Sequence, residues 1–316
     1  MRPLDAFDLP PEKERDLKKA RRLETWTLIY IASSTTFLGL TMGTSQAMRT
    51  SFFEDAFSSV PAIAFLVCTR IARRRANEDF PYGYHGVVSI GYLTASLSLV
   101  GLGGFLLVEA VTKLIAVERT TIGGMTLFGH TLWAGWPMLA AIAYTAIPSV
   151  FFGRAKLKLA PQIHDKILYA DAKMMKADWM AETATAVGVL GVGLGLWWLD
   201  PVAAALVSAD ILKDGVVNVY VAVHDLMERR PMKTDRSGPE PLPDELRACI
   251  ERLDWVAGAT VRLREVGHVF FGEVFVTPRG SPEDLPAKIR HAVADAKSIN
   301  WRLHDVTITV LDRPPE

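Results

Sequence analysis

Six long apolar stretches set the strongest constraint on what this chain can fold into. Each is close to or longer than the roughly 20 residues that a helix needs to cross the hydrocarbon core of a bilayer. In the 316-residue sequence they cover approximately residues 25–44, 52–71, 87–115, 131–152, 175–199 and 201–223. The sequence therefore predicts an integral membrane protein in which residues 25–230 form a bundle of six transmembrane helices.

Basic residues gather at alternate ends of these spans. They precede the first span and follow the second, fourth and sixth, as at Arg21, Arg74, Lys158 and Arg230. By the positive-inside rule, this pattern predicts that both termini are cytoplasmic. Residues 1–24 mix both signs of charge without an apolar signal segment, so we interpret them as a cytosolic lead, and a bacterial-type inner membrane is the simplest location.

The composition of the chain changes after the last span. Residues 231–243 are rich in proline, glycine and charge, which is typical of a linker. Residues 244–316 then alternate in character, and we predict helices and strands in the order α-β-β-α-β. The predicted elements cover residues 244–253, 260–265, 270–277, 286–299 and 306–311. We therefore expect a small ferredoxin-like α+β domain in the cytosol, which gains stability by dimerisation.

Two carboxylates lie within the fifth apolar stretch. Asp178 and Glu182 are four residues apart, about one helical turn, so both lie on one face of the predicted helix. An acidic side chain at the bilayer centre costs about 2.5–3.5 kcal/mol on insertion scales. This cost favours a bound cation or a transferable proton at the pair. The structural alternative is an ion pair of Asp178 with Lys173 or Lys176.

Two other acidic residues inside spans are interpreted as structural. Asp210 has Lys213 three residues later, and Glu109 has Lys113 four residues later. Both spacings allow an ion pair within one helix. We therefore expect these carboxylates to be neutralised locally.

Several functional classes are disfavoured by the sequence. The formal net charge is zero, which argues against a nucleic-acid partner. We find no nucleophile–base arrangement, no phosphate-binding loop and no catalytic metal triad, so an enzyme is not expected. Cys68 lies in an apolar span and Cys249 in an amphipathic helix, which makes a disulfide between them improbable.

Four segments resemble, in the right order, those of the cation diffusion facilitator family. They read RRRANEDFPYGYHG (73–86), YADAKMMKAD (169–178), WWLDPVAAALVSADILKDG (197–215) and RLREVGHVFFGEVFV (262–276). Members of this family are six-span metal/proton antiporters that work as homodimers and carry a cytosolic α-β-β-α-β domain. The resemblance thus implies efflux of a divalent metal by alternating access, with protons as counter-ions and no resident cofactor.

The resemblance also implies where the second span contributes to a metal site. The family sets two ligands one turn apart on the second span against two on the fifth. Placement from the Pro-Tyr-Gly motif puts Glu54 and Ser58 at the second-span positions. Asp55 could serve instead of Glu54 if the span is rotated. An alternative interpretation leaves both carboxylates in the outer headgroup region.

On the fifth span the resemblance implies a changed ligand set. Met174 stands at the usual histidine position and Asp178 at the usual aspartate position, while Glu182 could replace the missing ligand. Carboxylates alone would admit magnesium or manganese, whereas a coordinating thioether would favour ferrous iron, manganese or another transition metal. Zinc is the commonest cargo of the family, but the loss of histidine weakens that assignment. The alternative role of Met174 is core packing.

Two further metal sites of the family are eroded in this chain. In the loop after the second span, common ligand positions hold Asn77, Phe80 and Tyr84. In the soluble domain, Phe275 and Thr309 are among the residues at the usual ligand positions, so we expect no strong metal cluster there. This erosion leaves a second hypothesis open, a transport-inactive relative that acts as a regulatory or scaffolding subunit. That hypothesis predicts that the carboxylates of the second and fifth spans do not meet, or are neutralised by lysines.

Overall fold

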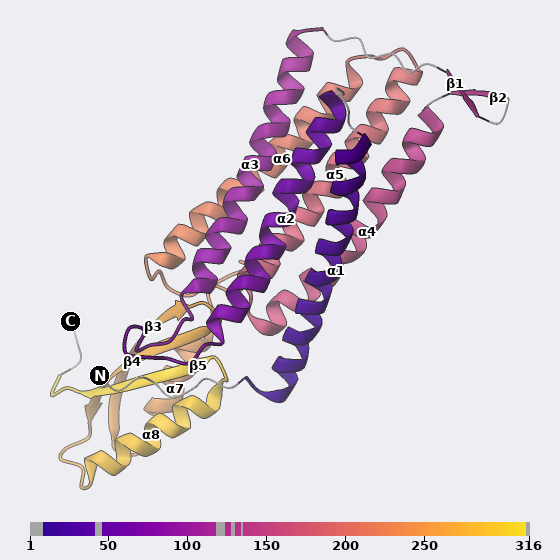
Figure 1. The fold of residues 1–316 in the computed structure, drawn as a ribbon. Coiled ribbons are helices and arrows are strands. Elements are labelled where there is room, and N and C mark those ends of the chain that lie inside the picture. Colours follow the sequence, from indigo (N-terminus) through magenta and orange to yellow (C-terminus); the bar gives the residue numbers. More distant parts are fainter. Residues whose placement is uncertain (1–8, 42–45, 118–123, 128–129, 134, 314–316) are drawn as a thin grey trace.

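The structure is a computed structural model, and it describes residues 9–41, 46–117, 124–127, 130–133 and 135–313. In this part of the chain, six helices of 27 to 31 residues form a bundle, with a small α+β domain at one end (Figure 1). The helices are α1 (Pro11–Thr41), α2 (Gln46–Ala72), α3 (Val87–Ile115), α4 (Gly135–Ile163), α5 (Lys166–Gly193) and α6 (Leu199–Leu226). The predicted architecture is confirmed, although residues 42–44 of the first predicted span and residues 1–8 of the lead lie outside the described residues.

Several helices begin at other residues than the predicted spans do. α1 begins at Pro11 rather than near residue 25, because Leu17 and Ala20 give the charged lead a buried apolar face. α4 begins at Gly135 rather than residue 131, because β2 (His130–Trp133) pairs with β1 (Gly124–Leu127) as a short antiparallel hairpin. α5 begins nine residues before residue 175, where the Asp165 side chain accepts a hydrogen bond from the Leu168 amide at 2.8 Å and caps the helix.

The helices differ in how they qualify as membrane spans. Within the described residues, three segments are long and apolar enough by themselves, namely Glu54–Ala72, Val87–Ile115 and Met138–Ile163. α1, α5 and α6 carry more charge and depend on packing inside the bundle. α3 and α6 approach each other closely at Gly103, where a Cβ would be 2.6 Å from the backbone nitrogen of Leu212. Small residues at such crossings allow helix backbones to approach.

The C-terminal domain has the predicted order of elements. It contains α7 (Leu242–Glu251), β3 (Val256–Val266), β4 (Val269–Pro278), α8 (Leu285–Ile299) and β5 (Leu303–Val310). β4 is the central strand, antiparallel to β3 and parallel to β5, because α8 provides the crossover that a parallel pair requires. The helices pack on the sheet through a core that includes Leu246, Phe270, Val274 and Ala292. α7 begins at Leu242, so the predicted linker ends slightly earlier than residue 243.

The tip of the β3–β4 hairpin docks where α5 begins and α6 ends. Nζ of Lys166 lies 2.8 Å from Oε1 of Glu265 on β3 and 2.7 Å from Oδ2 of Asp225 on α6. Nε2 of His164 lies 3.2 Å from the same Glu265 oxygen. Burial acts to raise the pKa of Glu265, but the hydrogen bond from His164 and the charge of Lys166 outweigh it, so the pKa is lowered. His268 lies in the hairpin turn, and its Nε2 lies 2.5 Å from Oδ2 of Asp165.

Candidate metal site in the transmembrane bundle

Carboxylates from α2 and α5 line one small cavity. Glu54 and Asp55 of α2 and Asp178 and Glu182 of α5 all border a space of about 50 Å³. The other residues that line it are Tyr30, Ile31, Ser34, Ser58, Leu102, Leu106, Thr145, Ser149, Met175 and Ala181. About 10–15 Å³ of such space is enough for one water molecule, so the cavity has room for one ion and a few water molecules.

Hydroxyl groups hold two of the carboxylates in place. The Ser58 hydroxyl of α2 donates a hydrogen bond to Oδ1 of Asp178 at 2.6 Å. The Thr35 hydroxyl of α1 donates to Oδ2 of Asp55 at 3.0 Å. Because Glu54 and Ser58 are one turn apart, one face of α2 is opposed to the Asp178 face of α5. The structure therefore brings together five of the six residues that the sequence suggested.

The sixth residue, Met174, lies elsewhere. Its side chain is fully buried and packs in an apolar cluster with Leu99, Leu102 and Ile211. The next residue, Met175, lines the cavity instead. Met175 is three residues before Asp178 on the same face of α5, so helical spacing alone could have suggested it. The thioether available to the site thus belongs to Met175.

The lysines near Asp178 interact with another helix. Both Lys173 and Lys176 form ion pairs with carboxylates of α6, and Nζ of Lys176 lies 3.1 Å from Oδ2 of Asp210. The alternative interpretation, in which Asp178 pairs with Lys173 or Lys176, is therefore wrong. The predicted pair of Asp210 with Lys213 is also wrong, because Asp210 pairs with Lys176 of α5 instead.

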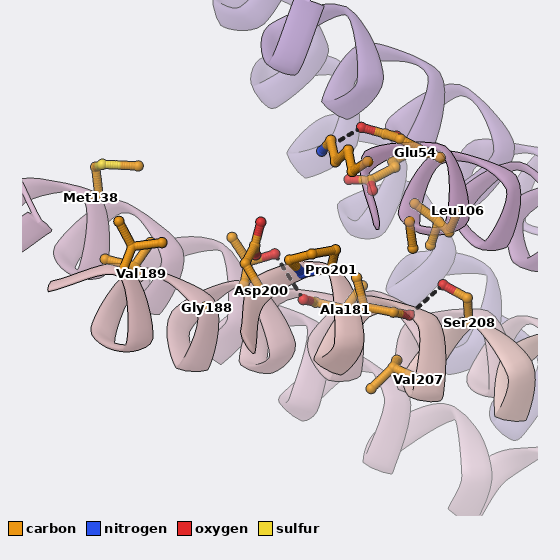
Figure 2. A pocket seen from close by; sticks show the side chains of 16 residues that line it. Glu54, Leu106, Met138, Ala181, Gly188, Val189, Asp200, Pro201, Val207 and Ser208 are labelled. Atoms are coloured by element: carbon orange, nitrogen blue, oxygen red, sulfur yellow. Dashed lines mark hydrogen bonds and ion pairs between the residues drawn. The ribbon is translucent and has the colours of Figure 1, made fainter. Parts of the chain in front are cut away.

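A second cavity adjoins the first at Glu54. It has a volume of about 280 Å³ and shares Glu54, Leu106 and Ala181 with the smaller cavity. Figure 2 shows Glu54 on one side of this space, with Asp200 and Gly188 on another. Val192 and Asp200 place it toward the end of the bundle where α5 ends and α6 begins, away from the C-terminal domain. We call it the distal cavity.

An ion pair lies in the wall of the distal cavity. Nζ of Lys113 is 2.7 Å from Oε1 of Glu109, which confirms the predicted pair within α3. Asp200, at the start of α6, lines the same space. The cavity therefore offers polar groups along its length, from Glu54 to the end of the bundle.

Three histidines border a third cavity, between the bundle and the C-terminal domain. His85, His268 and His304 line a space of about 290 Å³, and the ring centroids of His85 and His304 are 5.1 Å apart. Burial lowers the pKa of His85 to about 4, with repulsion from His304 and His268 adding to the effect. In the described residues, no three His, Cys, Asp or Glu side chains form a preformed metal cluster. In the transmembrane site, a cation would thus have to draw the four carboxylates together.

Six long helices, three of them with segments apolar and long enough to span a bilayer, beside a small α+β domain form the architecture of an integral membrane protein. Comparison with known families agrees, because residues 24–227 match the model of the cation efflux transmembrane domain. The match covers more than half of the chain, and the chain belongs to the cation efflux family. The family consists of transporters rather than enzymes, as the sequence predicted.

Curated relatives are distant but consistent with this family. The uncharacterized transporter YdbO of Bacillus subtilis (strain 168) is 28% identical over 209 residues, 64% of this chain and 66% of the relative. The magnetosome protein MamM of Paramagnetospirillum magneticum is 27% identical over 244 residues, 76% of this chain and 70% of the relative. The manganese efflux system protein MneS of B. subtilis is 25% identical over 169 residues, 54% of each chain. The chain thus spans 54 to 70% of the lengths of these relatives.

Proposed function

We propose that this protein exports a divalent transition-metal ion in exchange for protons, by alternating access of one site between α2 and α5. The observation that carries the proposal is the small cavity lined by Glu54, Asp55, Asp178 and Glu182, with no lysine or arginine among its described lining residues. Four carboxylates without a counter-charge in so small a space repel one another, and a divalent cation or bound protons would relieve that repulsion.

The donor set favours particular metals. Carboxylate and hydroxyl oxygens are hard ligands that suit Mn²⁺ or Mg²⁺, and the Met175 thioether is a soft ligand that Mg²⁺ does not use. We infer that Mn²⁺ and Fe²⁺ are the preferred cargo. The name of the relative MneS, a manganese efflux system protein, supports this inference. The same carboxylate oxygens bind either metal or protons, which provides a physical basis for antiport.

The proposed arrangement in the membrane follows from charge. The positive-inside rule supports cytoplasmic termini, which would put the C-terminal domain in the cytosol and the distal cavity toward the other side. We infer a homodimer formed through the C-terminal domain. The competing scaffold hypothesis requires carboxylates that do not meet or are neutralised by lysines, and the shared cavity favours transport instead.

Metal uptake into proteoliposomes tests this proposal. The purified protein is reconstituted with an internal pH indicator, a pH gradient is imposed, and uptake of manganese, ferrous iron, zinc, cobalt and magnesium is measured. Asp178→Asn should reduce uptake by about 10- to 100-fold, since one charged ligand contributes about 1.5–3 kcal/mol. Asp210→Asn is the matched control, because this carboxylate pairs with Lys176 outside the cavity. Unchanged uptake by Asp178→Asn would refute the site, and no uptake of any metal by folded parent protein would favour the scaffold.

A further inference from the structure

Three charged side chains from three helices are buried together below the metal site. Nζ of Lys156 on α4 lies 2.6 Å from Oδ2 of Asp171 on α5 and 2.9 Å from Oε2 of Glu24 on α1. Each of the three residues is 0% exposed. We call Glu24, Lys156 and Asp171 the ionic triad. Charged residues are almost never fully buried unless they are paired, so the triad joins the three helices at one level.

The triad forms a layer directly beneath the metal cavity. Each member is seven residues, or two helical turns, from a residue of the same helix that lines the cavity. The pairs are Glu24 and Ile31 on α1, Lys156 and Ser149 on α4, and Asp171 and Asp178 on α5. Two turns correspond to about 10 Å along a helix axis. The direction of each helix places all three members on the side of the C-terminal domain.

The triad depends on its lysine. One ammonium group lies within ion-pair distance of two carboxylates. Among the described residues, neither oxygen of Glu24 accepts a hydrogen bond, and nor does Oδ1 of Asp171. If Lys156 withdraws, two buried carboxylates face each other without a counter-charge, which is strongly unfavourable unless water enters. Separation of Lys156 from these carboxylates would therefore require water or another cation to reach them.

The two sides of the metal cavity differ accordingly. Toward the distal end, the cavity meets the larger space at Glu54. Toward the C-terminal domain, the fully buried triad joins α1, α4 and α5 below the cavity. We propose that the ionic triad is the inner gate of the transporter, closed in this structure, and that its Lys156 pairs break when the site opens toward the C-terminal domain. The role in ion passage rests on the proposed transport function.

Thiol labelling tests the gate without any metal. In full-length protein with Cys68→Ala and Cys249→Ala, Met175→Cys places a reporter on the cavity wall beside the triad. Sealed vesicles are treated with a membrane-impermeant thiol reagent on the side of the C-terminal domain. Lys156→Met should increase the labelling rate by about tenfold or more, since it leaves two buried carboxylates unpaired. The exchange variant Glu24→Lys/Lys156→Glu keeps two carboxylates and one ammonium, and should restore slow labelling.

Controls separate gating from a general loss of structure. A reporter at Val192→Cys, in the distal cavity, is treated with the same reagent from the opposite side of the membrane, and its labelling should not become faster with Lys156→Met. If Lys156→Met does not fold, Asp171→Asn, which keeps the Glu24–Lys156 pair, should still increase labelling of the 175 reporter several-fold.

The outcomes distinguish this proposal from the proposed function. Equal labelling of parent and folded lysine variant, or fast labelling of the exchange variant, would overturn the gate even if the parent transports metal. Faster labelling that the exchange variant reverses would support the gate even if no tested metal is transported.

Discussion

Acidification should weaken the native structure through His85, which lies between the bundle and the C-terminal domain. This residue is 9% exposed, and its ring lies against that of His304. Burial, with repulsion from His304 and His268, lowers its pKa from 6.5 to about 4. The unfolded chain therefore binds a proton at His85 more readily than the folded chain does. The contribution of His85 to stability should then fall as the pH drops below about 6.5 and continue to fall toward pH 4.

The two pKa values set the magnitude of the effect. Between pH 7.5 and pH 5, they correspond to a loss of about 2 kcal/mol in the free energy of unfolding. His85→Asn cannot take up a proton and should remove that part of the pH dependence. Burial also lowers the pKa of His164, which adds a contribution of the same sign to the pH dependence of both proteins.

Unfolding of the detergent-solubilised protein at several pH values measures the effect. Thermal midpoints of the parent and His85→Asn are compared at pH 7.5, 6 and 5, with His291→Asn on exposed α8 as the control. The parent should lose more stability than His85→Asn does, and the control should follow the parent. Identical pH profiles for the parent and His85→Asn would refute the reasoning, because they would mean that His85 titrates normally in the folded protein.

Two further substitutions test the contacts that hold the fold together. Glu265→Gln should weaken docking of the hairpin by about 3 kcal/mol, because Lys166 and His164 lose a shared charged acceptor. Weaker docking should speed proteolysis between residues 232 and 241, and an unchanged cleavage rate would contradict the prediction. Gly215→Val should lower the free energy of unfolding by about 1–3 kcal/mol, because a Cβ there would lie 2.8 Å from the backbone nitrogen of Val100 on α3. The thermal midpoint measures this loss, and an unaltered midpoint would show that α3 and α6 can separate freely.

The architecture was predictable because its signals are local. Apolar length identifies the spans, and alternating patterns identify the C-terminal elements. The errors occur where a distant contact decides the boundary. α5 begins nine residues early because Asp165 caps it and Lys166 meets Glu265, about a hundred residues further along the chain. The β1–β2 hairpin escaped prediction because Leu132 and Trp133 are apolar and continue without a charged residue into the fourth span.

The candidate site was predictable only in part. The cost of burying charge identifies Asp178 and Glu182 from one sequence, whereas their partners on α2 came from the resemblance to the family. Met174 and Met175 are four and three residues before Asp178, so helical spacing allows either of them to lie near it. The packing of the bundle places Met175 at the cavity and Met174 in an apolar cluster. The ionic triad could not be predicted, because Glu24 and Lys156 stand in charged segments at the ends of spans, which look like exposed surface.

The docked hairpin has a practical consequence for anyone who wishes to study the C-terminal domain alone. Glu265 and His268 point out of that domain and find their partners, Lys166 and Asp165, in the bundle. An excised domain would expose this carboxylate and this imidazole to water, and Glu265 would lose the His164 and Lys166 contacts that lower its pKa. Its acid–base behaviour would therefore describe a fragment, and the full-length chain is the proper object for such measurements.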